Sequence, residues 1–159
     1  MLNILLPSDG SELALDAVHH VLRLAQEGLQ VSVVLANVQE PTYLYEMVLA
    51  PGAELLEASL AAGMHALEPA QALLDAAGLP YENEVGSGDP AHTLLDIAER
   101  YGCDVIVLGA RGIGGLRDAL LGSVSKTLLH DATIPVTVVK HAEPAESAEE
   151  AEAGAEIES

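Results

Sequence analysis

The stretch of residues 104–125, DVIVLGARGIGGLRDALLGSVS, decides the fold of this chain. It starts with the apolar run Val105–Leu108, which ends at Gly109 and predicts a buried strand. A glycine-rich loop is expected over residues 110–121, followed by a helix from Ser123 to His130. A strand, a glycine-rich loop and a helix in this order are typical of α/β folds with a parallel sheet.

The chain continues this alternation before and after that stretch. Further strands are expected at residues 2–6, 31–38, 80–85 and 135–139, and further helices at residues 11–27, 53–77 and 89–101. We expect Pro69 to kink or break the helix at 53–77, and Gly86–Pro90 to form a loop with Asp89 as a helix cap. The order of elements predicts one doubly wound α/β domain over residues 1–140, with a five-stranded parallel sheet.

The composition predicts an aliphatic core and an acidic surface. The chain has 159 residues, half of them apolar, with no Phe and no Trp. Its formal net charge is −19, and it stays at −12 without the seven acids that follow Lys140. Because an acidic body repels phosphate backbones, nucleic acid is not expected as a partner. The Ala/Glu-rich residues 141–159 are predicted to be a disordered tail.

Sequence features also predict a cytoplasmic protein. The start of the chain has no basic region before its short apolar run, and no apolar stretch is long enough to span a membrane.

Cys103 is the one cysteine, so no internal disulfide can form, and its place before a buried strand favours an inert thiol. Met64 is expected to pack in the core or against a loop. His19, His20 and His65 lack acid or thiol partners at the spacing of metal ligands, so no protein metal site is expected.

The glycine-rich stretch is a candidate phosphate site. Three of the six basic residues, Arg111, Arg117 and Lys126, fall within it or directly after it. Gly109 is expected where the backbone must approach a ligand closely, and Gly112 can form a tight reversal. The start of the next helix would direct backbone N–H groups at an anion. The alternative is that the glycines only make a flexible loop, with Ser123 as an ordinary helix cap.

Generic nucleotide motifs do not account for the site. The chain has no G-x-x-x-x-G-K-[ST] run, which excludes the P-loop. Residues 86–91 match a relaxed G-x-G-x-x-A pattern, but they follow the third expected strand, so a turn with an Asp cap is the favoured interpretation. Asp9, Val38 and Gly109 follow or end different strands, and parallel topology places them at the same carboxyl edge of the sheet. Asp9 is open to two interpretations, as a turn former and as a ligand-binding residue.

The spacing of glycines resembles that of the universal stress protein family. Its nucleotide-binding members carry Gly-x2-Gly-x9-Gly-[Ser/Thr] after the fourth strand, and Gly109, Gly112, Gly122 and Ser123 meet that spacing. The sequence around these glycines is also similar to that of the family, with VLGARG at the start of the loop, LLGSVS at its end and IPVTVV at the last strand. The opening ILLPSDGS resembles the first strand and loop of the family, so the resemblance covers residues 1–140.

This resemblance implies a fold, a cofactor and a set of binding residues. The fold would be of the adenine-nucleotide α-hydrolase type, with strand order 3-2-1-4-5 and a homodimer paired through the strand at 135–139. The cofactor would be ATP, or ADP or AMP, with Mg²⁺ or Mn²⁺ held through its phosphates. Ala110 replaces a position that is often polar in the family, and the acidic tail has no counterpart there. The implied contacts are Pro7 and Val38 at the base, Asp9 at the ribose or base, and Gly109, Arg111, Gly112, Gly122, Ser123, Val124 and Ser125 around the ribose and phosphates.

Three functions remain open from the sequence. The first is an ATP-binding regulatory protein of the stress response, whose nucleotide state selects a protein partner. The second is a slow ATPase or phosphotransfer enzyme in which Asp9 holds a metal or positions a water. The third is a dimerisation domain with a vestigial site. No G-x-S-x-G motif occurs, and Ser123 and His130 would stand about 10 Å apart along their helix, so no nucleophile–base pair is expected.

Overall fold

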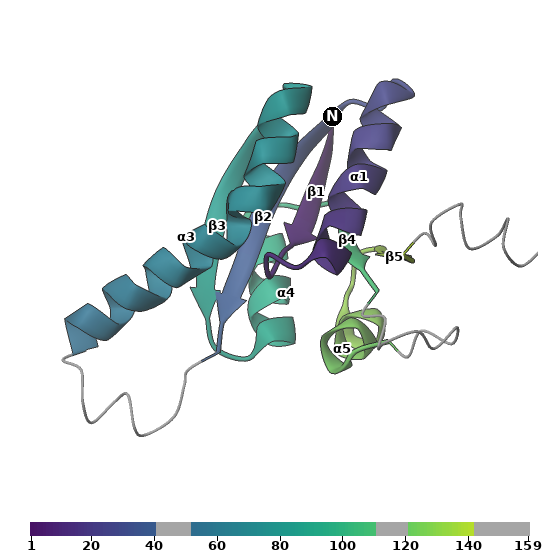
Figure 1. Cartoon of the computed structure of the whole chain (residues 1–159). Coiled ribbons are helices and arrows are strands. Elements are labelled where there is room, and N and C mark those ends of the chain that lie inside the picture. Colours follow the sequence, from purple (N-terminus) through teal and green to yellow (C-terminus); the bar gives the residue numbers. More distant parts are fainter. Residues whose placement is uncertain (41–51, 111–120, 142–159) are drawn as a thin grey trace, which may run out of the picture.

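A computed structural model of the chain describes residues 1–40, 52–110 and 121–141. These residues form a five-stranded parallel sheet in the order β3-β2-β1-β4-β5, which confirms the predicted topology (Figure 1). The elements in chain order are β1 (Leu2–Pro7), α1 (Glu12–Gln26), β2 (Val31–Gln39), α3 (Gly52–Ala77), β3 (Tyr81–Ser87), α4 (Pro90–Arg100), β4 (Val105–Gly109), α5 (Ser123–Asp131) and β5 (Val136–Val139).

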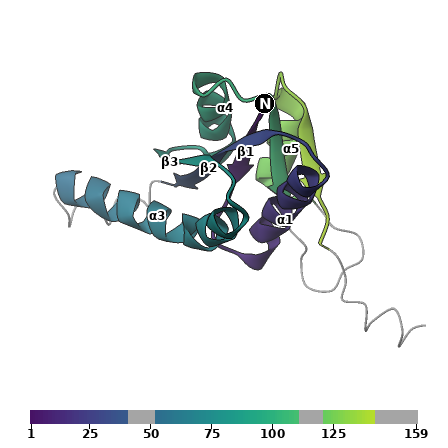
Figure 2. The same cartoon turned by 90° about the horizontal axis from the view of Figure 1, so that it is seen from above.

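Helices cover both faces of the sheet. Figure 2 shows α1 and α3 on one side and α4 and α5 on the other. The central strand β1 is buried on both faces because Ile4 and Leu6 pack with the first pair of helices, while Leu5 packs with the second pair. This double burial explains why the strands are almost continuous apolar runs. Apart from Cys103, the buried residues of the two core clusters are aliphatic, as the composition predicts.

The predicted caps fix where two helices begin. Ser11 caps α1, and its hydroxyl accepts a hydrogen bond from the Ala14 N–H at 3.3 Å. Asp89 caps α4 by accepting from the His92 N–H at 3.0 Å, with Pro90 in the first helical position. Both arrangements satisfy N–H groups that the helix itself leaves without partners.

One local prediction is corrected by the structure, and for another the structure decides between two alternatives. Gly86 and Ser87, expected in a loop, continue β3 because they pair with Val38 and Gln39 at the end of β2. For Pro69, the predicted break is wrong, since α3 runs unbroken from residue 52 to residue 77. The predicted kink is supported, since Figure 1 shows the helix changing direction along its length. A proline removes one helical hydrogen bond and is a common cause of such a bend.

Gly109 is required for packing as well as for the loop that follows it. A Cβ at this position would overlap the carbonyl oxygen of Leu13 and would stand 3.0 Å from the Leu13 carbonyl carbon. The backbone of α1 therefore fills the space in which a side chain would lie. Packing is thus a second reason for a glycine here, beside the close approach to a ligand that the sequence predicts. The next residue, Ala110, is buried, and its N–H donates to the Val139 carbonyl at 2.8 Å.

None of the helices in the described ranges combines the length and the apolar character that crossing a bilayer requires. The expected disorder of the acidic tail falls on residues 142–159, which lie outside the described residues.

We predict that Gly109→Ala lowers the free energy of unfolding by about 1–3 kcal/mol, because the added methyl group meets a backbone that cannot rotate away. Urea denaturation without nucleotide measures this loss separately from any effect on binding. Gly52→Ala is the matched control, since a Cβ there meets no atom within 4 Å. Equal stability of Gly109→Ala and the parent protein would show that α1 can move aside at no cost.

Candidate functional site

A pocket of about 410 Å³ opens at the carboxyl edge of the sheet, where β1 and β4 are neighbours. The chain leaves β1 towards one face of the sheet and leaves β4 towards the other, which makes this the topological switch point. Four segments line the pocket: Pro7, Ser8, Asp9, Ser11, Leu13 and Ala14; Ala36, Asn37, Val38 and Glu40; Pro90 and Leu94; and Leu108, Gly109, Gly122, Ser123, Val124 and Ser125.

The predicted binding residues come together in this pocket. Eight of the ten line it, although they come from three separate parts of the sequence. The other two, Arg111 and Gly112, lie outside the described residues. The expectation that the strand ends at Asp9, Val38 and Gly109 meet at one edge is therefore confirmed.

The loop after β1 forms the first wall. The buried Ser8 continues the strand pairing, because its N–H donates to the Ala36 carbonyl at 2.8 Å. Asp9 is exposed, and its Oδ1 accepts from the Ser11 N–H at 2.9 Å, which turns the chain into α1. Gly10, between Asp9 and Ser11, has φ of +84°, a backbone conformation that residues other than glycine rarely adopt. Asp9 is thus both a turn former and a pocket residue.

Asn37 ties the end of β2 to this loop. Its side-chain Nδ2 donates to the Ser8 carbonyl at 2.8 Å, and its Oδ1 accepts from Gln39 Nε2 at 2.6 Å. The side chain is buried, so these hydrogen bonds fix the relative position of two walls of the pocket. Sequence reasoning missed Asn37. The available signal was a polar amide inside the otherwise apolar run of β2.

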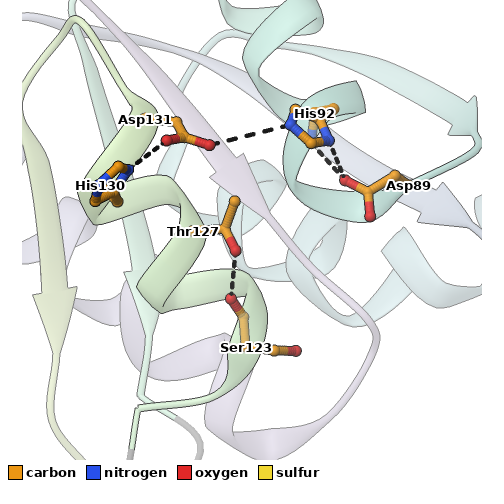
Figure 3. Close-up of polar contacts among 6 residues, drawn as sticks. All are labelled: Asp89, His92, Ser123, Thr127, His130 and Asp131. Carbon is orange, nitrogen blue, oxygen red and sulfur yellow. Dashed lines mark hydrogen bonds and ion pairs between the residues drawn. The ribbon is translucent and has the colours of Figure 1, made fainter.

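The N-terminus of α5 forms the opposite wall. Gly122 is its N-cap residue, with an extended backbone and no side chain to cap the helix. The N–H groups of the first turn therefore have no side chain of the cap residue to donate to, and this turn borders the pocket. This corrects the alternative in which Ser123 is the cap. Ser123 is exposed in the first turn, and its carbonyl accepts from Thr127 Oγ1 at 3.0 Å (Figure 3), while Ser125 is buried.

The start of α4 closes the pocket from a direction that the sequence did not indicate. Within residues 86–91 the predicted Asp89 cap is confirmed by its hydrogen bond from the His92 N–H, whereas Gly86 and Ser87 belong to β3. Pro90 and Leu94 nevertheless line the pocket. The position of this loop, after the carboxyl end of β3, was the signal that could have placed it there.

The charged side chains described at the pocket are both acidic. Within the described residues, its charged lining consists of the carboxylates of Asp9 and Glu40, and no His, Cys, Lys or Arg borders it. The same part of the chain holds no cluster of three or more metal-ligating side chains. Cys103 is buried at the other end of β4, and burial raises its pKa to about 11, so its thiol stays neutral. No nucleophile–base pair is assembled by these residues.

A chain of acids and histidines joins α4 to α5 on the outer surface (Figure 3). His92 Nδ1 lies 2.7 Å from Asp89 Oδ2, and its Nε2 lies 4.0 Å from Asp131 Oδ2. Asp131 also pairs with His130, whose Nδ1 lies 2.6 Å from Asp131 Oδ1. The hydrogen bond from the His92 N–H is the main cause that lowers the pKa of Asp89, whereas the hydrogen bond to Asp131 raises the pKa of His130.

We predict that an NMR titration of His130 gives a pKa above its ordinary value of 6.5, and that Asp131→Asn returns it towards that value. Since the folded pKa is the higher one, this interaction stabilises the fold at pH values below the unfolded pKa. The contribution is lost as the pH rises through the folded pKa. Glu99→Gln removes one exposed carboxylate from α4 and serves as the control. A His130 pKa that Asp131→Asn leaves unchanged would rule out the contact.

Comparison with known proteins assigns the family. The family model described as the universal stress protein family matches residues 1–140. Universal stress protein MJ0531 of Methanocaldococcus jannaschii is 31% identical over 138 residues, covering 86% of this chain and 81% of that protein. Universal stress protein YxiE of Bacillus subtilis is 29% identical over 147 residues, covering 86% of this chain and 97% of that protein.

The similarity extends to three dimensions. The solved structure of the hypothetical protein MJ0577 superposes with a TM-score of 0.72 at 28% identity, covering 89% of this chain and 97% of that one. The match over residues 1–140 spans all five strands and the four segments that line the pocket. Sequence, topology and site thus agree, and the chain belongs to the universal stress protein family.

Proposed function

We propose that this protein binds an adenine nucleotide in the pocket between β1 and β4 and acts as a nucleotide-dependent regulator in the cytoplasmic stress response. The observation that carries the proposal is the uncapped N-terminus of α5, which borders a pocket whose other walls include the apolar residues Pro7 and Val38. A helix N-terminus favours phosphate, because its N–H groups and its dipole both attract an anion. A volume of about 410 Å³ is in the range of small-molecule sites.

The proposed contacts divide the nucleotide between the walls of the pocket. Pro7 and Val38 would hold the base, and Asp9 would bind near the ribose or base. Gly109, Gly122, Ser123, Val124 and Ser125 would surround the ribose and phosphates, together with Arg111 and Gly112 from the segment outside the described residues. Eight of these residues line the pocket, which supports the assignment.

Proteins with the same fold indicate the chemical class of the ligand. A universal stress family protein from Arabidopsis thaliana was solved with AMP bound, and another universal stress protein was solved in complex with cAMP. They are 20% and 21% identical to this chain, with TM-scores of 0.65 and 0.61. At this identity the likeness shows a shared fold and does not by itself assign a ligand to this chain. The adenine nucleotide is the shared chemistry, and ATP is the form that we propose for this chain.

A regulatory role suits the site better than catalysis. The described pocket lining offers no histidine as a general base. No third metal-ligating side chain of the described residues lies beside its two carboxylates. We therefore propose that Mg²⁺ or Mn²⁺, where present, arrives with the phosphates of the nucleotide. Binding without rapid turnover would let the loaded state persist and select a protein partner.

We predict that the folded protein binds ATP in a calorimetric titration and that Ser123→Ala weakens binding by about tenfold, as expected for the loss of a hydrogen bond to a charged group. Thr127→Ala is the matched control, because its hydroxyl donates to the Ser123 carbonyl but does not line the pocket. Titrations with ADP and AMP would rank the phosphate chain lengths. Folded protein that produces no heat with any of the three nucleotides would refute the proposal.

The ATPase alternative has its own outcome. Steady phosphate release from ATP that Asp9→Asn abolishes, while ATP binding is spared, would favour an enzyme over a switch. The absence of turnover in the parent protein would reject the enzyme.

We also propose that two copies pair through β5, an edge strand without charged side chains. The Ile106 N–H donates to the Pro135 carbonyl, and the Ala110 N–H donates to the Val139 carbonyl. Because alternate residues of a strand bond to the same neighbour, Val136 and Val138 should direct their backbone groups to the open edge. The other edge strand, β3, carries Glu82 and Glu84, a common protection against pairing.

We predict a particle of about 33 kDa in sedimentation, twice the 16.5 kDa chain. Val138→Pro removes one N–H that faces the open edge and should give monomers. Thr137→Ser keeps the backbone donors and should remain dimeric. Circular dichroism checks that both variants are folded. A folded Val138→Pro variant that stays dimeric would place the interface elsewhere.

A further inference from the structure

The first half of α3 carries apolar side chains that the sheet does not cover. At 26 residues the helix is about 39 Å long, whereas the nine residues of β2 span about 30 Å. Figure 1 shows the first turns of α3 running out past β2 and β3. A helix that is longer than the strands beneath it leaves part of its inner face without a partner among the residues that the structure describes.

Three side chains define this uncovered surface, which we call the α3 stripe: Leu56, Leu60 and Met64. They are spaced four residues apart and so follow one side of the helix. Leu56 is 69% exposed, Leu60 52% and Met64 36%, so exposure falls steadily towards the sheet. Met64 therefore does not belong to the core, which was one of the two places that the sequence predicted for it. The stripe continues the side of α3 that is fully buried at Leu67 and Leu74.

The α3 stripe has an acidic border. Glu57 and Glu68 are both exposed, and helical spacing places them beside Leu60 and Met64. The His65–Glu68 pair, 3.2 Å apart, involves a histidine and adds no permanent positive charge. Residues 52–77 contain four carboxylates and no Lys or Arg. The surface therefore combines an apolar line with negative charge only.

These features select one kind of partner. A second copy of this chain would bring its own acidic border against this one, and the repulsion between these like charges opposes such a contact. Anionic membranes and nucleic acids are repelled in the same way. We infer that the α3 stripe is a docking surface for a basic amphipathic helix of another protein, whose apolar side chains pack on Leu56, Leu60 and Met64 and whose Lys or Arg side chains pair with Glu57 and Glu68.

This surface gives the protein a binding site that does not depend on its nucleotide pocket. The stripe lies on the part of α3 that follows the carboxyl end of β2 in the chain, whereas the pocket lies between β1 and β4. The two leucines line no part of the pocket. Loss of docking and loss of nucleotide binding can therefore be measured separately.

A first experiment asks whether the stripe is accessible in the full chain. In Leu60→Cys the added thiol is the reactive one, because the native Cys103 is buried. We expect a maleimide reagent to label it at the rate of a free thiol. Slow labelling that becomes fast on unfolding would mean that the protein covers its own stripe, and would overturn the inference.

The second experiment measures docking itself. The probe is a synthetic helix with leucines at positions i, i+4 and i+8 and lysines on both flanks, compared with a scrambled peptide of the same composition. Fluorescence anisotropy should show the patterned peptide binding at least about tenfold tighter than the scrambled one. Equal binding of the two peptides would reduce the effect to charge alone and would contradict a docking surface.

Variants of the full chain locate the contact. The double variant L56S/L60S keeps every charge and should lose the preference for the patterned peptide. Leu29→Ser is the matched control, since Leu29 is 42% exposed but lies before the amino end of β2, whereas the stripe follows its carboxyl end. The double variant E57Q/E68Q should bind the patterned peptide more weakly and with less dependence on salt.

Two outcomes of the variant series would contradict the inference. Binding of the patterned peptide to L56S/L60S with the parent affinity would place the contact elsewhere. A fall in the sedimenting mass of L56S/L60S in the absence of peptide would assign the stripe to contacts between copies of this chain.

Discussion

The neighbouring strands β1 and β4 send the chain to opposite faces of the sheet, and the candidate site depends on this arrangement. The chain leaves β1 into α1, which packs with one core cluster, and leaves β4 towards α5, which packs with the other. The diverging connections leave a crevice at the carboxyl edge that the helices do not fill. Gly109 maintains this geometry, because the close approach of β4 to the backbone of α1 leaves no room for a side chain.

A short set of hydrogen bonds then holds the walls of the crevice in place. Asn37 joins the end of β2 to the loop after β1, and Asp9 turns that loop into α1. Asp89 starts α4 at another wall. Because these hydrogen bonds hold three of the walls in position, the pocket is formed by the fold itself. A preformed site loses little conformational entropy when a ligand binds.

Periodicity and turn residues in the sequence were sufficient to predict the elements and the parallel sheet, whereas the strand order and most of the site residues were implied by the resemblance to the universal stress protein family. The apolar runs, the glycine stops and the caps at Ser11 and Asp89 are local signals, and each is found in the structure. Contacts between distant segments could not be predicted in this way. Nothing next to Gly109 in the sequence indicates that Leu13 lies against it, and Asn37 acquires its role only when β1 lies beside β2. Met64 shows a related limit, because helical spacing identifies an apolar side but not where the sheet beneath it ends.

The distribution of charge separates the two surfaces that this protein would use. The nucleotide pocket relies on backbone dipoles at α5, whereas the α3 stripe combines leucines with carboxylates. An acidic protein can bind an anion at the first because helix N–H groups act over a short range. The second excludes anions and favours a basic partner. A nucleotide and a basic helix would therefore not compete for the same groups.

Amide chemical shifts recorded by NMR during titration with ATP test the central claim most directly. The account predicts the largest changes at the backbone N–H groups of Gly122–Ser125 and at Val38, with Tyr81 unaffected. Tyr81 belongs to a second cavity, lined also by Asn3 and Tyr101 near the amino ends of the strands. Changes centred on that second cavity, or no changes in the α5 amides at saturating ATP, would contradict the assignment of the phosphate site to the N-terminus of α5.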